Sequence, residues 1–158
     1  MKQRLWMLAA GCLFALAAQS QETVAVNTGN IVSPEVDTAA QTVTFRLLAP
    51  AAKEVTVEAD YFGKVQKQTP LGAVEMPLRQ AMTRDTAGVW TLETPMPAPE
   101  LHTYCFYVDG LRMVDPSNVY MLRDIATYTN YFLVDGELSA NYFVREVPHG
   151  TVSKAVSY

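Results

Sequence analysis

The side chains that could act as catalytic bases in this sequence are His102 and His149. Ester hydrolysis by a serine enzyme requires a Gly-x-Ser-x-Gly turn, which presents the serine oxygen to a histidine and to an oxyanion hole. The sequence contains no such turn, and neither histidine has a serine or cysteine beside it in a nucleophile setting. We therefore predict that the chain is not an enzyme and that both histidines have structural or surface roles.

Metal and cofactor sites also lack the residue spacing that they require. No cluster of His, Cys, Asp or Glu has the spacing of metal ligands, and no glycine-rich loop could cradle a phosphate. Cys105 is expected to be a small packed side chain. We predict no metal and no cofactor, which leaves binding of another molecule as the chemistry of this chain.

The elements that would position binding residues are β-strands. After residue 21, runs of alternating apolar and polar residues recur between turn-forming Gly, Pro, Asn and Asp, a pattern typical of a β-sandwich. The residues expected to point inward are Val43, Phe45 and Leu47; Val55, Val57 and Ala59; Trp90 and Leu92; and Tyr104, Phe106 and Val108. The sequence thus predicts an all-β fold whose core lies between two sheets.

Turn residues set the boundaries of these strands. Asp109-Gly110 predicts a tight hairpin, because both positions can take a positive φ angle. Turns are also expected at 85–88 and at 115–118, and in the second of these Asp115 can accept backbone N–H bonds. Further strands are predicted over 111–114, 127–134 and 142–147, whereas 61–81 is too irregular to assign.

Several segments, in their order along the chain, resemble the N-terminal early-set immunoglobulin-like domain of secreted bacterial esterases. These segments are Val43–Val55, Gly88–Trp90, Tyr104–Gly110, Asp115–Asn118 and Val147–Gly150. Such domains are classed with the family 48 carbohydrate-binding modules, which are related to glycogen-binding domains. The resemblance covers most of 31–158 and implies an immunoglobulin-like (early-set) β-sandwich. In feruloyl and acetyl-xylan esterases, Pro-His-Gly leads into an α/β-hydrolase domain, which we expect to be missing from this chain.

The resemblance also implies where a sugar could bind. The glycogen-binding relatives use two tryptophans and a lysine, but this chain has Cys105 at the position of the lysine and Arg112 at that of one tryptophan. The segment of the second tryptophan offers Tyr61 and Phe62. Xylan-type chains are therefore expected in preference to glycogen. The candidate carbohydrate-binding residues are Tyr107, Arg112, Thr127, Tyr128 and Asn130.

Two classes of function follow from these residues and from the resemblance. In the first, the chain is a non-catalytic accessory module of a secreted carbohydrate-active esterase, and it either binds a plant-type polysaccharide or packs against the C-terminal esterase domain. In the second, it is a stand-alone structural or interaction domain, or a truncated esterase, that binds no glycan. A hydrolase reading frame beside the gene, or its absence, would distinguish the two classes.

The N-terminus has the features of a secretory signal peptide. Lys2 and Arg4 precede the uncharged run 5–18, and small residues allow cleavage before Gln21, with a second possible site after Ala17. The alternatives are a membrane anchor, for which the run is short, and lipidation at Cys12. We predict a secreted or periplasmic bacterial protein, free of the membrane after cleavage. Its parts would be a signal peptide (1–20), a linker (21–30), the sandwich (31–147) and a second linker (148–158).

Composition and charge exclude several other classes. The 158 residues carry a net charge of −4, and the Lys and Arg residues are dispersed, so that no basic patch could bind nucleic acid. Nearly half of the residues are hydrophobic, which is typical of one globular domain. Cleavage of the signal peptide would leave Cys105 alone, so the mature chain could form no internal disulfide.

Overall fold

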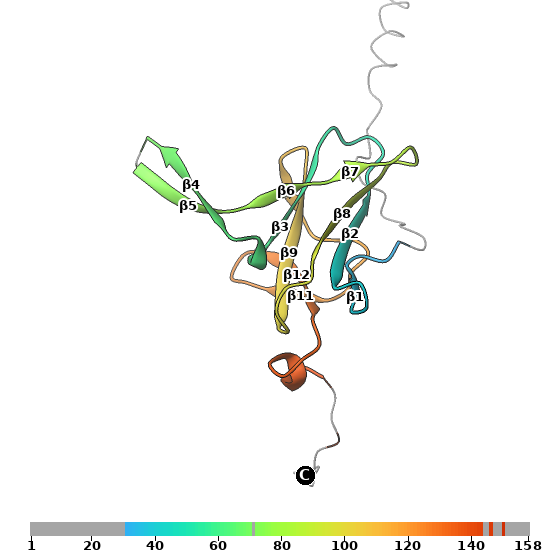
Figure 1. The fold of residues 1–158 in the computed structure, drawn as a ribbon. Helices are drawn as coiled ribbons and strands as arrows, with labels where there is room; N and C mark the ends of the chain where they lie inside the picture. Colours follow the sequence, from blue (N-terminus) through green and yellow to red (C-terminus); the bar gives the residue numbers. More distant parts are fainter. Residues whose placement is uncertain (1–30, 71, 144–145, 147–149, 151–158) are drawn as a thin grey trace, which may run out of the picture.

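The computed structural model describes residues 31–70, 72–143, 146 and 150 of the chain. Within them, the chain forms antiparallel β-strands, turns and the short 3₁₀ segments η1 (Asp60–Phe62) and η2 (Ser139–Asn141). The strands form an immunoglobulin-like β-sandwich (Figure 1), and the predicted fold class is therefore confirmed.

The first sheet has four strands in the order β1-β2-β8-β7. Their bounds are β1 (Glu35–Asp37), β2 (Thr42–Leu48), β7 (Thr83–Arg84) and β8 (Val89–Pro95). β2 pairs with β8 along its full length, from Thr42 opposite Pro95 to Leu48 opposite Val89. The predicted inward residues Val43, Phe45 and Leu47 are fully buried. Their alternation with more polar residues directs one face of β2 to the core.

The second sheet has six strands, with β9 at its centre. The order is β11-β12-β9-β3-β6, and β10 pairs with β9 beyond the end of β12. Their bounds are β3 (Val55–Ala59), β6 (Arg79–Ala81), β9 (Leu101–Val108), β10 (Leu111–Met113), β11 (Met121–Arg123) and β12 (Tyr128–Leu133). Tyr104, Phe106 and Val108 of β9 are buried, as predicted.

The chain crosses from the second sheet to the first at Met82. β6 pairs with β3 and β7 pairs with β8, so two consecutive short strands lie in opposite sheets. Met82 itself is buried, and its N–H donates to the Val55 carbonyl at 2.9 Å. This crossing covers one side of the core.

Aromatic side chains from both sheets pack together in the core between them. Phe45 of β2 lies 4.9 Å from Tyr104 and 6.0 Å from Phe132, measured between ring centroids. Trp90 is buried as predicted, and its indole N–H donates to the Ala49 carbonyl at 2.9 Å. The core therefore combines large apolar rings with a satisfied indole donor.

A network of polar side chains is buried at one end of the core. The Tyr104 hydroxyl donates to Asp115 at 2.8 Å and accepts from the Asn118 amide at 3.0 Å. Asn130 accepts from the Asp115 N–H at 2.6 Å and donates to the Asn118 carbonyl at 3.0 Å. These bonds fix the turn at 115–118 against β9 and β12, and they satisfy groups that would otherwise be costly to bury.

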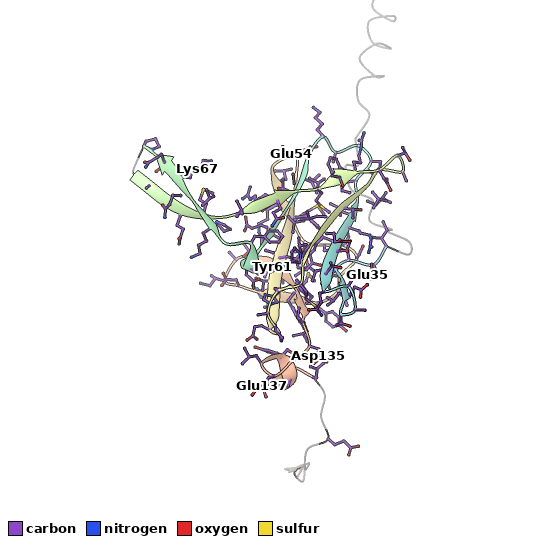
Figure 2. The ribbon with its side chains drawn as sticks, in the orientation of Figure 1. Glu35, Glu54, Tyr61, Lys67, Asp135 and Glu137 are labelled. Carbon is purple, nitrogen blue, oxygen red and sulfur yellow. The ribbon has the colours of Figure 1, made fainter. Side chains whose placement is uncertain are left out.

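A two-stranded arm projects from the body of the sandwich (Figure 1). It consists of β4 (Lys64–Thr69) and β5 (Gly72–Pro77), which pair with each other and with no other strand. Figure 2 shows Lys67 on this arm, away from the body. None of its described residues is buried, and the arm and β6 occupy the segment that the sequence left unassigned.

The predicted strand at 142–147 is wrong for the part that the structure describes. Tyr142 and Phe143 follow η2 in a turn and a bend, and the Tyr142 N–H donates to the Ser139 carbonyl at 2.9 Å. Both side chains are about half exposed, at 55% and 43%.

Several predictions fall outside the described residues. They concern the signal peptide, the linker at 21–30, His149 and nearly all of the linker at 148–158. Within the described part of the chain, no helix is long and apolar enough to cross a membrane.

Candidate functional site

The outer face of the six-stranded sheet brings several predicted binding residues together. We use this name for the surface formed by Glu58, Arg79, Tyr107, Arg112 and Thr129. The inward side chains alternate with these residues along their strands, and the register places Arg112 opposite Tyr107 and Arg79 opposite Glu58. The face is thus polar, in contrast to the apolar inner face of the same sheet.

Arg79 covers one face of the Tyr107 ring. Its guanidinium carbon lies 3.3 Å from the ring centroid, and its Nε donates to Glu58 at 2.9 Å. Burial, together with the carboxylate of Glu58, raises the pKa of the Tyr107 hydroxyl above its ordinary value. Because a cation–π contact occupies one ring face, only the other face and the hydroxyl could contact a ligand.

Arg112 lies at a shallow cavity of about 200 Å³ on this face. Its Nη1 donates to the Tyr128 carbonyl at 2.8 Å, which joins the β9–β10 hairpin to β12. Thr103, Cys105 and Thr129 also line the cavity. Burial raises the pKa of the Cys105 thiol although Arg112 opposes the change, so this cysteine has none of the thiolate character of a nucleophile.

Thr127 and Tyr128 lie at the start of β12. Both are exposed, Tyr128 to 50%, and Thr127 closes the β11–β12 hairpin through backbone bonds with Asp124. The guanidinium of Arg123 lies 5.9 Å from the Tyr128 ring centroid. Tyr107 and Arg112 therefore lie together on the outer face, whereas Tyr128 contributes its backbone carbonyl there and its ring lies on the side of β12 that carries Asn130.

Asn130 does not belong to this surface, which corrects the prediction that it contacts a sugar. It lies opposite Tyr104, whose side chain points into the core, and it is 0% exposed. Its amide bonds the backbone of Asp115, Asn118 and Tyr120. Side chains alternate along a strand, so the neighbouring Thr129 takes the outward position instead.

Tyr61 and Phe62 do not form an exposed platform for sugar rings. Phe62 packs edge-on against Phe45 at 6.5 Å, and the Tyr61 hydroxyl bonds Thr94 at 2.9 Å. Burial raises the pKa of Tyr61 to about 12. Figure 2 shows Tyr61 against the body of the sandwich, where it supports the core.

His102 has a structural position, as predicted. It is buried, its Nδ1 lies 3.1 Å from Asp60 and its Nε2 lies 2.8 Å from the Ala98 carbonyl oxygen. Asp60 also accepts the Thr103 N–H at 3.0 Å. These contacts tie η1 to the start of β9.

Glu58, Arg79 and Thr129 were not among the residues predicted from the sequence. The signal for Glu58 was present, because it alternates with the predicted inward residues Val57 and Ala59. Arg79 could not have been placed, because its segment had no assigned strand. In the described residues, no group of three or more His, Cys, Asp or Glu side chains could hold a metal ion.

Comparison with known proteins gives no family assignment. No protein-family model matches the sequence, and no curated protein is similar to it. Among solved structures, several pullulanases contain a part that is similar to this chain. One is the apo enzyme of Paenibacillus barengoltzii, with 26% identity and a TM-score of 0.43; the match covers 70% of this chain and 15% of that one. Another is the GBS pullulanase SAP in complex with maltotetraose, with 16% identity and a TM-score of 0.47; the match covers 72% of this chain and 16% of that one. A third is the Anoxybacillus sp. LM18-11 enzyme complexed with maltotetraose, with 23% identity and a TM-score of 0.43; the match covers 87% of this chain and 17% of that one. Because the chain spans only about a sixth of their length, we base the function proposed below on its own residues.

Proposed function

We propose that this chain is a non-catalytic accessory domain that binds a neutral polysaccharide on the outer face of its six-stranded sheet. The observation that carries the proposal is the position of Arg112 at the shallow cavity, where the Tyr128 carbonyl holds its guanidinium. A guanidinium has five N–H donors, so the bond to Tyr128 leaves donors for sugar hydroxyls. Thr103 and Thr129 add polar groups at the same cavity.

The residues favour xylan-type chains over glycogen. Cys105 is buried, and both Tyr61 and Phe62 pack against the core, so the flat aromatic platform of the glycogen-binding relatives is replaced by a small polar cavity. The order of motifs resembles the N-terminal domains of secreted bacterial esterases, and the first twenty residues resemble a signal peptide. We infer that the domain accompanies an exported carbohydrate esterase.

Affinity electrophoresis in native gels tests this proposal. The protein is run in gels that contain xylan, glycogen or no polysaccharide, together with Arg112→Ala and Lys67→Ala. Lys67 is exposed on the projecting arm, so its variant removes the same charge without altering the outer face. We expect retardation by xylan, little retardation by glycogen, and about tenfold weaker xylan binding in Arg112→Ala alone.

Two results would contradict the proposal. Equal retardation of Arg112→Ala and the unmodified protein by xylan would show that the outer face does not bind the sugar. Stronger retardation by glycogen than by xylan would show that the missing platform does not determine specificity.

Packing against a second folded domain is the other candidate function. Exposed apolar side chains favour it, since Val119 is 81% exposed and Ile125 is 95% exposed, with Met121 and Leu122 nearby in the chain. Apolar patches of this kind commonly mark contact surfaces. If a hydrolase is encoded beside this gene, co-purification with it that is lost in the double variant Leu122→Ser and Ile125→Ser would support this function.

A further inference from the structure

A second hollow, which we call the aromatic groove, lies at the other end of β12. It has a volume of about 710 Å³, within the range of small-molecule sites, and Val32, Ser117, Tyr120, Tyr131, Tyr142 and Phe143 contribute to its lining. It shares no lining residue with the cavity at Arg112. Its walls come from residues 31–34 before β1, the 117–120 loop, β12 and the segment after η2.

The lining residues fit an uncharged ligand. None of the described residues that line the groove is charged. An anion or cation would enter without an opposite charge, and desolvation of an unpaired charge costs far more than desolvation of a neutral molecule whose hydroxyls are hydrogen-bonded. The side chains that the groove offers are aromatic rings, aliphatic groups and hydroxyls, the combination that contacts the C–H faces and O–H groups of sugars.

Two tyrosines of the groove, Tyr120 and Tyr131, pack against each other, and the ring of Tyr120 is accessible. Tyr120 and Tyr131 have centroids 5.7 Å apart and ring planes tilted by 50°. The Tyr131 N–H donates to the Tyr120 carbonyl at 3.2 Å, which fixes the loop beside the strand. Tyr120 is 62% exposed, so its ring is open to a ligand while its backbone is held in place.

Ser117 supplies a second, independent indication of a ligand. Its Oγ is buried yet has no hydrogen-bond partner among the described residues. Such atoms are rare in folded proteins, because an unpaired buried hydroxyl is unfavourable. Ser117 lines the aromatic groove, and rotation of its enclosed side chain would bring this oxygen to a ligand hydroxyl there.

We propose that the aromatic groove binds pyranose units of a neutral polysaccharide, as a second contact in addition to the outer face. The inference rests on the proposed function for the identity of the sugar. A pyranose ring would lie against Tyr120, and one of its hydroxyls would bond Ser117 Oγ. One polysaccharide chain that reaches both sites binds more tightly than either site alone would allow, because the second contact is intramolecular.

Binding of xylotetraose, measured by titration calorimetry and by saturation-transfer NMR, tests the inference. The variants are Tyr120→Ala, Ser117→Ala, Arg112→Ala and the control Val65→Ala, which is on the projecting arm. We expect Tyr120→Ala to weaken binding about tenfold in the groove and Ser117→Ala about fivefold, with Val65→Ala unchanged. Ser117→Ala should melt at the same or a higher temperature than the unmodified protein, which separates a ligand contact from a structural role.

The outcomes separate this inference from the proposed function. Unchanged binding in both Tyr120→Ala and Ser117→Ala, with a loss in Arg112→Ala, would overturn the groove while the outer face stands. A loss in the groove variants alone would support the groove and overturn the outer face. No binding of either xylotetraose or xylan by the unmodified protein would overturn both.

Discussion

Asp115 is the residue in which burial and charge are most directly opposed. It is 2% exposed, and its carboxylate accepts from the Tyr104 hydroxyl and from the Ser117 N–H, each at 2.8 Å. Desolvation nonetheless dominates these bonds and raises the pKa of its carboxyl above the ordinary value of 3.8. The folded protein therefore holds this proton more tightly than the unfolded chain does.

Asp115→Asn should reveal this proton through the pH dependence of stability. The contribution of Asp115 to the unfolding free energy is greatest below pH 3.8, the ordinary pKa of its carboxyl. This contribution falls as the pH rises to the higher pKa of the folded state, and it is constant above that pKa. The unfolding free energy of the variant, relative to the unmodified protein, should therefore increase as the pH rises above 3.8. Urea unfolding across this range measures the difference, with the exposed Asp135→Asn as control. A difference that decreases with pH would contradict the assigned direction.

Trp90 is expected to contribute more stability than any residue of the arm. Trp90→Ala removes a buried indole and should cost about 3–5 kcal/mol. Trp90→Phe keeps most of the apolar volume but leaves the Ala49 carbonyl without its indole donor, and it should cost about 1–3 kcal/mol. Chemical unfolding of both variants separates the contribution of the ring from that of the hydrogen bond. Equal losses would mean that the hydrogen bond, and not the ring, accounts for the stability.

Asn130 and Thr129 show what sequence patterns could and could not predict about the site. Alternation placed the apolar residues of β2, β3 and β9 correctly, because each buried residue is followed by an outward one. In β12 the inward residues include the polar Asn130, so hydrophobicity alone does not reveal which residues face the core. Only the pairing of Asn130 with Tyr104 shows it, and pairing is a property of the folded sheet.

At the scale of elements, turns were predictable where the backbone itself selects the residue. The hairpin at 109–110 has φ angles of 49° and 85°, both in the left-handed region that Asp and Gly tolerate. Asp109 also accepts the N–H groups of Lys53 and Glu54, at 2.8 and 2.9 Å. The arm could not be predicted in this way, because it buries neither face and so has no strict alternation.

Gly88 and Gly110 allow the cost of crowding to be separated from the cost of a positive φ. Their φ angles are nearly equal, 84° and 85°, but a Cβ at Gly88 would lie 2.5 Å from Pro50 Cβ, whereas one at Gly110 would meet nothing within 4 Å. Gly110→Ala should therefore cost about 1–2 kcal/mol. Gly88→Ala should cost about 1–3 kcal/mol more, because the backbone of Pro50 must shift. Thermal unfolding that ranked the two variants equally would show that Pro50 moves freely.

At the scale of the whole molecule, the sandwich and the arm differ in how they are stabilised. The sandwich encloses a continuous core from Val43 to Val134. The arm begins after η1, whose Phe62 packs on that core, and its base is closed where the Leu78 N–H donates to the Gly63 carbonyl at 3.0 Å. The stability of the domain should therefore depend on η1 and little on the strands beyond it.

Removal of the arm tests this division. Replacing residues 64–77 with an Asn-Gly turn keeps Gly63 and Leu78 next to each other and removes no buried side chain from the described residues. We expect the melting temperature to change by less than about 3 °C, whereas Phe62→Ala should lower it by about 5 °C or more.

Xylan binding should also stay within about twofold of that of the unmodified protein, because Pro77 is the only residue of the arm among the described residues that line the cavity at Arg112. A large loss of stability on removal of the arm would show that β4 and β5 support the sandwich. A loss of xylan binding without loss of stability would place the arm at the glycan itself.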